Sequence, residues 1–273
     1  MLRPPLVELA PGVFAVPTST VEGWCGLLVG DRRTLVLDTG KDAPEGRTVA
    51  RAAKGLGRPA DLLAYSHGHW DHAGGGGAFA TAEVVAHRDA LPMVVEQLAK
   101  SDGPPGAGVP TVTVSGEVAF ELGGLTARLL PTPGHAPGAM SLLVEGAGVL
   151  FGGDTVVTAI PPAFTDGDSV ALEATLRSLA RIELDVLVPG HGAIVRGAAA
   201  IREALTWPAD YLGRVRDHVG RLAGSHTDDE VVALTEYSVF VGDRLAADRY
   251  KMATRHQRTV RQMLLELRAG VPA

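Results

Sequence analysis

The sequence contains a single cysteine, Cys25, and few aromatic residues. One cysteine excludes an intrachain disulfide, which is compatible with a reducing compartment, and we expect its thiol to be buried. Aromatic residues make up 5% of the 273 residues, whereas hydrophobic residues make up 46%. Small aliphatic side chains must therefore fill most of the core, which suits closely packed layers of helix on sheet.

The sequence also lacks the segments that direct a chain to or across a membrane. No apolar run approaches the roughly 20 residues that span a bilayer, and residues 1–5 show neither the basic nor the apolar part of a signal peptide. We therefore predict a cytoplasmic protein without a membrane partner. The formal net charge of −6 also argues against a nucleic-acid partner, because nucleic-acid binders usually carry a basic stripe.

Basic residues gather near the C-terminus, but acidic residues interleave in the earlier part of the same region. The group consists of Arg244, Arg249, Lys251, Arg255, Arg258, Arg261 and Arg268. We interpret it as a solvated helix face rather than as a track for phosphate groups.

Three histidines and one aspartate fall within six residues, at His67, His69, Asp71 and His72. Imidazole nitrogen and carboxylate oxygen are good ligands for zinc and related cations. His67 and His69 are two residues apart, so in an extended turn both face one side and can chelate one ion. Asp71 and His72 come at the end of the turn and can face a neighbouring ion. This segment therefore predicts a metal site.

Three distant motifs repeat a pattern of apolar strand, glycine and candidate ligand. They carry His135 within residues 131–135, Asp154 within residues 150–155 and His191 within residues 186–192. Loops at the strand ends of an α/β sandwich converge to build binding sites. We therefore expect these three side chains to complete the site that begins at residue 67.

The pattern His67-x-His69-x-Asp71-His72, followed by His135, Asp154 and His191, resembles the metallo-β-lactamase superfamily of metallohydrolases. The resemblance covers residues 10–196 and fills every ligand position of the family in order. It implies an α/β fold, the four-layer αβ/βα sandwich of that superfamily. It also implies two divalent metal ions as cofactors, zinc by preference, with iron or manganese as alternatives.

The resemblance further implies a role for each residue. His67, His69 and His135 would bind the first ion, Asp71, His72 and His191 the second, and Asp154 would bridge both together with a water or hydroxide. Metal coordination makes such a water nucleophilic at neutral pH. Asp71 and Asp154 would be the catalytic residues, with Asp71 also guiding a proton.

An aspartate at position 154 resembles glyoxalase II-like thioesterases, lactonases and related hydrolases. We therefore predict a hydrolase of a small-molecule ester, thioester or lactone. The alternatives are an amide hydrolase like the zinc β-lactamases, which typically lack this aspartate bridge, and a persulfide dioxygenase-like oxygenase, which uses a single iron. A non-catalytic metal-binding protein is another alternative, but purely structural zinc sites favour cysteine ligands. The oligomeric state stays open, with a homodimer among the options.

The hydrophobic pattern predicts short strands and helices along the chain. We expect strands near residues 13–16, 25–29, 34–37, 62–65, 84–86, 117–122, 125–130, 140–144, 149–151 and 185–188, and helices near 43–55, 72–79, 90–99 and 168–181. After residue 197 we expect helices over 198–222, 227–235 and 245–268, with Thr227 as a cap. This gives a metal-binding sandwich over residues 1–196 and a helical extension over 197–273 that packs on it.

Four features near the motifs have more than one interpretation. Asp38 either orients a ligand histidine or begins a turn. The glycines of residues 74–77 allow close backbone approach and positive φ. We interpret His87 as a cap or packed polar residue rather than a ligand, and residues 101–110 as a surface insertion rather than a lid.

The helical extension offers candidate pocket residues, for each of which core packing or surface exposure is the alternative. They are Tyr211, Tyr237, Arg249, Tyr250, Lys251 and His256.

Overall fold

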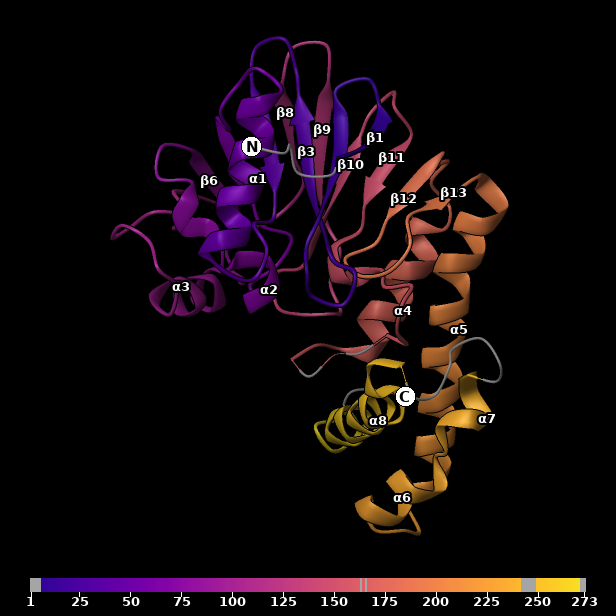
Figure 1. Ribbon diagram of the computed structural model, residues 1–273. Helices are drawn as coiled ribbons and strands as arrows, with labels where there is room; N and C mark the ends of the chain where they lie inside the picture. The colour runs from indigo at the N-terminus through magenta and orange to yellow at the C-terminus, as the bar shows by residue number, and fades with distance from the viewer. Residues whose placement is uncertain (1–5, 163, 165, 242–248, 271–273) are drawn as a thin grey trace.

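Two β-sheets pack face to face between outer layers of helices (Figure 1). The computed structural model describes residues 6–162, 164, 166–241 and 249–270. Helices α1 (Ala43–Gly55), α2 (Trp70–Ala73) and α3 (Leu91–Ala99) lie against the outer face of the first sheet. Helices α4 (Ser169–Leu179) and α5 (Ala198–Leu222) lie against that of the second. The predicted four-layer αβ/βα sandwich is therefore confirmed.

The first sheet follows chain order from one edge to the other. Its strands are β1 (Val7–Ala10), β2 (Val13–Pro17), β3 (Trp24–Val29), β4 (Thr34–Leu37), β5 (Leu62–Ala64), β6 (Glu83–His87) and β7 (Val112–Val114). Strands β1 to β4 pair antiparallel. Strands β4 to β7 pair parallel, so they need crossover connections. Helix α1 (Ala43–Gly55) supplies the crossover from β4 to β5, and α3 (Leu91–Ala99) lies in the connection from β6 to β7.

The second sheet has the order β13-β12-β11-β10-β9-β8. Its strands are β8 (Val118–Glu121), β9 (Thr126–Pro131), β10 (Met140–Val144), β11 (Val149–Phe151), β12 (Val186–Val188) and β13 (Val195–Arg196). Strand β10 is antiparallel to both β9 and β11, and β12 is parallel to β11. Strands β9, β11 and β12 therefore run in one direction, and the loops after them leave the sheet at the same edge.

Aliphatic side chains fill the space between the sheets. Leu35 and Leu37 of β4 face Leu142 of β10 and Phe151 of β11 within one buried cluster, and each is at most 2% exposed. Cys25 is buried on the outer side of the first sheet, beside α1. Both the aliphatic filling and the buried thiol agree with the sequence-based expectation.

The C-terminal helices continue the outer layer of the second sheet. They are α5 (Ala198–Leu222), α6 (Asp228–Leu234), α7 (Tyr237–Val241) and α8 (Met252–Arg268). One hydrophobic cluster joins Leu187 of β12 and Leu176 of α4 (Ser169–Leu179) to Leu205 of α5 and Val260 of α8. Figure 1 shows α5 running past the end of the sandwich, where α6, α7 and α8 gather. The domain division at residue 196 stays a prediction.

Helix boundaries match the sequence best where a capping residue marks them. Thr227 caps α6 in a reciprocal capping box with Glu230, as predicted from its position. The predicted helix over 245–268 is wrong at residues 250 and 251, because Tyr250 and Lys251 have φ of 56° and 55° and α8 begins only at Met252. Residues 245–248 lie outside the described residues. The sequence analysis also missed α7 and β13.

The glycine tract after the metal-binding turn packs tightly against the backbone. A Cβ at Gly75 would lie 2.3 Å from the Thr39 carbonyl oxygen, so the predicted close approach is confirmed. The predicted positive φ is wrong, since no glycine of residues 74–77 has it. The predicted helix over 72–79 is also wrong in part, because α2 (Trp70–Ala73) ends before the tract and only the short 3-10 turn Gly76–Ala78 follows.

Among the described residues, none of the helices combines the length and the apolar character that a bilayer-spanning segment requires.

The crowding at Gly75 yields a stability prediction. Gly75→Ala should lower the free energy of unfolding by about 1–3 kcal/mol, because the added methyl must displace backbone on two sides. Gly55→Ala, at the end of α1 with nothing within 4 Å of the added Cβ, is the matched control and should leave stability unchanged or slightly higher. Urea unfolding measures both. Equal stability of the two variants would contradict the packing argument.

Candidate metal centre

The first four predicted ligands lie on one short turn at the edge of the sandwich. His67 and His69 occupy the turn between β5 and α2, and His69 is the residue that precedes the first turn of α2. Asp71 and His72 lie within α2 itself. Because Asp71 and His72 are helical, their side chains point in a different direction from those of His67 and His69.

The other three predicted ligands leave the second sheet at the edge where β9, β11 and β12 end. His135 follows β9, Asp154 lies in the 3-10 turn Gly153–Thr155 after β11, and His191 follows β12. The shared direction of these strands explains why residues far apart in sequence meet. All seven predicted side chains lie together.

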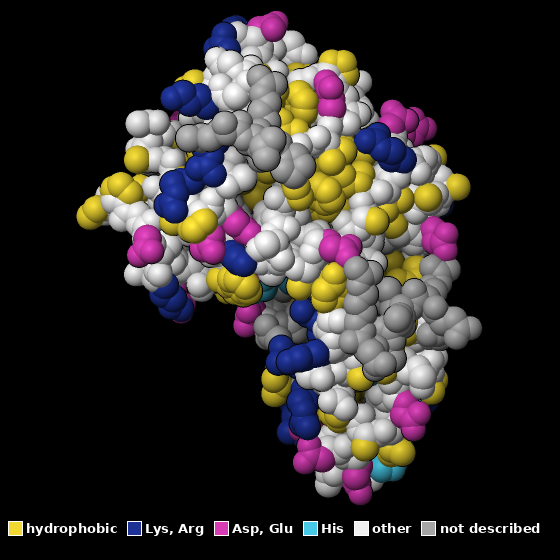
Figure 2. Space-filling view, in the orientation of Figure 1, with side chains coloured by type: hydrophobic (Ala, Val, Ile, Leu, Met, Phe, Trp, Pro, Cys, Tyr) yellow, Lys and Arg dark blue, Asp and Glu magenta, His cyan; other side chains and the backbone are white. Residues whose placement is uncertain are grey.

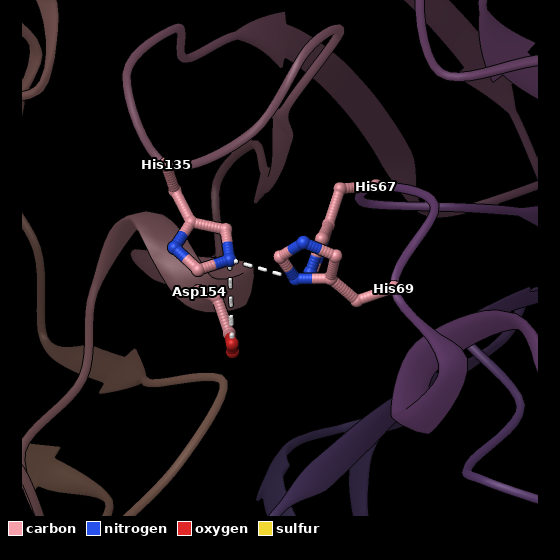
Figure 3. Close-up of side chains that lie close together, drawn as sticks. All are labelled: His67, His69, His135 and Asp154. Atoms are coloured by element: carbon pink, nitrogen blue, oxygen red, sulfur yellow. Dashed lines mark hydrogen bonds and ion pairs between the residues drawn. The ribbon is translucent and has the colours of Figure 1, made fainter. Parts of the chain in front are cut away.

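These side chains form two adjoining clusters. His67, His69, His135 and Asp154 make up the first, and Asp71, His72 and His191 the second. Within each cluster the candidate ligand atoms lie within 4.8 Å of one another. Figure 3 shows the first cluster, in which the rings of His69 and His135 point toward each other, with His135 Nε2 3.1 Å from His69 Nδ1.

Asp154 lies between the clusters and offers one carboxylate oxygen to each. Its Oδ2 is 3.6 Å from His135 Nε2. Its Oδ1 is 3.2 Å from His72 Nε2 and 3.4 Å from His191 Nε2. A Cβ at Gly190 would lie 1.9 Å from this Oδ1, so the glycine before His191 leaves the space that the carboxylate occupies.

A buried hydrogen-bond network orients two of the imidazoles. Ser66 Oγ donates to Asp38 Oδ2 over 2.6 Å and therefore accepts from His67 Nδ1, which lies 3.0 Å away. His72 Nδ1 donates to the same Asp38 oxygen over 2.8 Å. Both rings consequently present Nε2 to the centre. Of the two interpretations of Asp38, these contacts favour the orienting one.

Two other rings have outer partners that the sequence analysis missed. His191 Nδ1 lies 3.0 Å from the Thr20 carbonyl oxygen. His69 Nε2 lies 3.2 Å from Asp166 Oδ2. A contact to a backbone carbonyl cannot be predicted from residue types, and no sequence motif surrounds Asp166. Ser66, by contrast, is adjacent to His67 and could have been proposed from its position.

Several polar atoms at the centre are buried without a hydrogen-bond partner among the described residues. They are His67 Nε2, His72 Nε2 and Asp154 Oδ1, and the 3.2 Å approach of the last two lacks hydrogen-bond geometry. Burying such atoms unpaired costs several kcal/mol in total. Cations bound at the two clusters would satisfy all three, so the donor set fits metal ions.

The electrostatics of the centre separate the imidazoles into two groups. Burial lowers the pKa of His67 well below its ordinary value and that of His135 to about 4, so both are neutral, the form that binds metal. Burial also acts to lower the pKa of His72 and His191, but the neighbouring carboxylates together outweigh it. Asp154 and Asp38 raise the pKa of His72, and Asp154 and Asp71 bring that of His191 to about 10. Around Asp154, positive charge is thus stabilised.

A cavity of about 410 Å³ opens onto both clusters. His69, His135, Asp71, Asp154 and His191 contribute to its lining. The remaining walls include apolar side chains and two arginines of α8, namely Trp70, Val157, Ile160, Phe164, Arg255 and Arg258. This volume lies within the usual range for small-molecule sites. Arg255 and Arg258 belong to the basic group interpreted from the sequence as a solvated helix face. Arg258 is exposed and Arg255 is half-buried, and both also line this cavity.

The described candidate pocket residues of the helical extension do not line this cavity. Tyr211 and His256 are buried and hydrogen-bonded to each other over 2.7 Å, and Tyr237 is buried beside them. Tyr250 donates to Glu22, and Lys251 is exposed. The side chain of Arg249 lies outside the described residues. For Tyr211, Tyr237 and His256 the core-packing alternative therefore holds.

Two further interpretations concern residues outside the clusters. His87 belongs to neither cluster and accepts a hydrogen bond from the Asp89 backbone N–H over 3.2 Å, as expected for a packed polar residue. Residues 101–110 contribute nothing to the lining of the cavity over the part of the chain described. The surface-insertion interpretation of this loop is thus favoured over a lid.

Comparison with known sequences identifies one family. The model of the Metallo-beta-lactamase superfamily matches residues 19–191 of the chain. A hydroxyacylglutathione hydrolase from Anaeromyxobacter dehalogenans is 34% identical over 174 residues, which cover 59% of this chain and 61% of that protein. Thioesterase pkgB from Emericella nidulans is 31% identical over 179 residues, covering 63% of this chain and 46% of that protein. The chain therefore spans about half to three fifths of the length of these relatives.

Comparison with solved structures extends the likeness to the C-terminal helices. A metallo-beta-lactamase family protein from Thermus thermophilus superposes with a TM-score of 0.68 at 20% identity. The superposition covers 96% of this chain and 95% of that one. At 20% identity the superposition shows a similar fold and nothing about activity.

The network around Asp38 yields a prediction about metal affinity. Asp38→Asn keeps the side-chain size and tolerates the φ of 62° at this position. The amide NH2 accepts no hydrogen bond, so in either orientation asparagine loses part of the contacts that both Asp38 oxygens accept from Ser66 and His72. Zinc affinity should therefore fall about 10- to 100-fold. Competition with a chromophoric chelator measures the affinity. Asp89→Asn, at an exposed acid outside the clusters, is the control. An affinity within twofold of the unaltered protein would contradict the orienting role.

Proposed function

We propose, from the premise that the chain belongs to the metallo-beta-lactamase superfamily, that it hydrolyses a small-molecule thioester, ester or lactone at a pair of divalent metal ions. Membership of this superfamily and the hydrolase names of two relatives support a metal-dependent hydrolase. The observation that carries the finer proposal is the position of Asp154, with one oxygen toward each of two clusters of imidazole and carboxylate ligands.

Each ion has a proposed set of ligands. His67, His69 and His135 would hold the first ion, Asp71, His72 and His191 would hold the second, and Asp154 would serve both. The three buried atoms without partners support this assignment. The ligands are nitrogen and oxygen atoms without thiolate, which favours zinc in a catalytic rather than a structural role, with iron and manganese as alternatives.

Ions held there would supply a water acidified to a pKa of about 7 and a Lewis acid for the scissile carbonyl. The protein orients the ligands through Asp38, Ser66 and the Thr20 carbonyl. Asp71 Oδ2, 3.3 Å from His191 Nε2, lies at the wall of the cavity. From this position the Asp71 carboxylate can accept the proton that the attacking water loses.

The substrate class rests on the cavity and on the relatives. A cavity of about 410 Å³ suits a small molecule. Two relatives bear the names hydroxyacylglutathione hydrolase and thioesterase. We therefore place thioesters first among the three substrate classes.

Metal analysis and turnover test this function together. Protein purified without added metal should contain two divalent ions per chain, measured by inductively coupled plasma mass spectrometry. The same protein should hydrolyse at least one member of a panel of thioesters, aryl esters and lactones. One iron per chain with oxygen consumption would replace the proposal by the oxygenase alternative, and metal without any turnover would support a non-catalytic binding protein.

The bridging residue yields a sharper prediction. Asp154→Ala should lose metal and reduce kcat/KM by at least about a thousandfold, because several kcal/mol of charge stabilisation are removed. The far-ultraviolet circular dichroism spectrum should be unchanged. Asp210→Ala, an exposed aspartate on α5 that pairs with Arg177, is the control. Full metal content and activity in Asp154→Ala would refute the bridging role.

A further inference from the structure

Two arginines of α8 line the same cavity as the metal clusters. Arg255 and Arg258 share its wall with the apolar side chains of Ile160 and Phe164 and with Trp70, which is 51% exposed. Figure 2 shows Lys and Arg side chains gathered along the edge of the helical part that faces the hollow beneath the sandwich. The cavity thus combines an apolar surface and two arginine side chains with the carboxylates of Asp71, Asp154 and Asp166.

Hydrogen bonds to the segment before α4 hold α8 in this position. Thr259 Oγ1 donates to the Pro162 carbonyl over 3.1 Å. Gln262 Nε2 donates to the Gly167 carbonyl over 3.1 Å. One turn further, Glu266 accepts from the Ser169 backbone N–H over 2.9 Å. Since positions 255, 258, 259, 262 and 266 recur at helical spacing, the face that anchors α8 is also the face that carries both arginines.

The start of α8 fixes Arg255 further. Arg255 Nε donates to the Tyr250 carbonyl over 3.0 Å. The Tyr250 hydroxyl in turn donates to Glu22 Oε1 over 2.9 Å. Glu22 follows Thr20 and Val21, which line the cavity. The Arg255 side chain is therefore linked through Tyr250 to the N-terminal part of the chain, and its terminal nitrogens have no hydrogen-bond partner among the described residues.

Neither arginine has a carboxylate partner in the described ranges 6–162, 164, 166–241 and 249–270. The neighbouring arginines of α8 differ in this respect, since Arg261 pairs with Asp229 over 2.9 Å and Arg268 pairs with Asp228. A guanidinium stays protonated in proteins. Two such charges beside a metal centre attract anions into the cavity.

We propose that Arg255 and Arg258 bind an anionic group of the substrate, a carboxylate or a phosphate, at a distance from the bond that is cleaved. The subsite deepens the proposed hydrolase function and rests on it. Guanidinium groups match both anions with paired N–H donors. The apolar wall formed by Ile160, Phe164 and Val157 takes the uncharged part of the same molecule.

Matched substrate pairs test the subsite. A first pair compares succinyl with butanoyl thioesters of one thiol, a second places the carboxylate on the thiol, and a third places a phosphate there. The unaltered protein should prefer at least one anionic member, at least tenfold in kcat/KM. Arg258→Gln should reduce that preference about tenfold or more, chiefly by raising KM for the anionic member. The pair that responds identifies the anion and its position.

Arg261→Gln is the control, because it makes the same substitution one turn along α8, at an arginine that pairs with Asp229. It should leave both the preference and the activity unchanged. The double variant Arg255→Gln and Arg258→Gln should abolish the preference. Circular dichroism and thermal unfolding show whether each variant is folded. A folded double variant that keeps the preference would overturn the subsite, as would an unaltered protein without any preference.

A binding measurement separates failure of the subsite from failure of the hydrolase proposal. If no thioester is cleaved, amide analogues of the same pairs are titrated into metal-loaded protein by calorimetry. Tighter binding of an anionic analogue that Arg258→Gln weakens at least tenfold supports the subsite without any turnover. Equal binding by both proteins overturns it.

Discussion

The site depends on one constraint, which is that buried lone pairs need a partner. His67 Nε2, His72 Nε2 and Asp154 Oδ1 are buried in the two clusters without hydrogen bonds among the described residues. Their outer atoms, by contrast, are engaged, because Asp38 and Ser66 hold both rings from behind. The protein thus stabilises an arrangement that is unfavourable on its own and that a cation would satisfy.

Strand direction explains how the chain builds this arrangement. His135, Asp154 and His191 follow β9, β11 and β12, which run in one direction within the second sheet. The turn after β5 meets them from the first sheet. The buried aliphatic cluster between the sheets keeps the two edges together. The packing that stabilises the sandwich therefore also sets the spacing of the two clusters.

The C-terminal helices contribute a wall of the cavity as well as a layer of packing. Helix α8 shares a hydrophobic cluster with α4 and α5. Its polar side chains donate hydrogen bonds to backbone carbonyls of the segment before α4. That segment carries Phe164 and Asp166, of which Asp166 contacts His69. The helical extension is thus coupled through short contacts to both the cavity and a proposed ligand.

The sequence alone determined the seven candidate ligands and most of the strands and helices, because imidazole, carboxylate and glycine spacing at strand ends is a local pattern. The helix cap at Thr227 could likewise be predicted from its position before three acidic residues. Only the tertiary structure decided that Arg255 and Arg258 face the cavity while Tyr211 and His256 are buried. All four lie on amphipathic helices, and which face of a helix meets the site depends on the packing of α8 against a loop some ninety residues earlier.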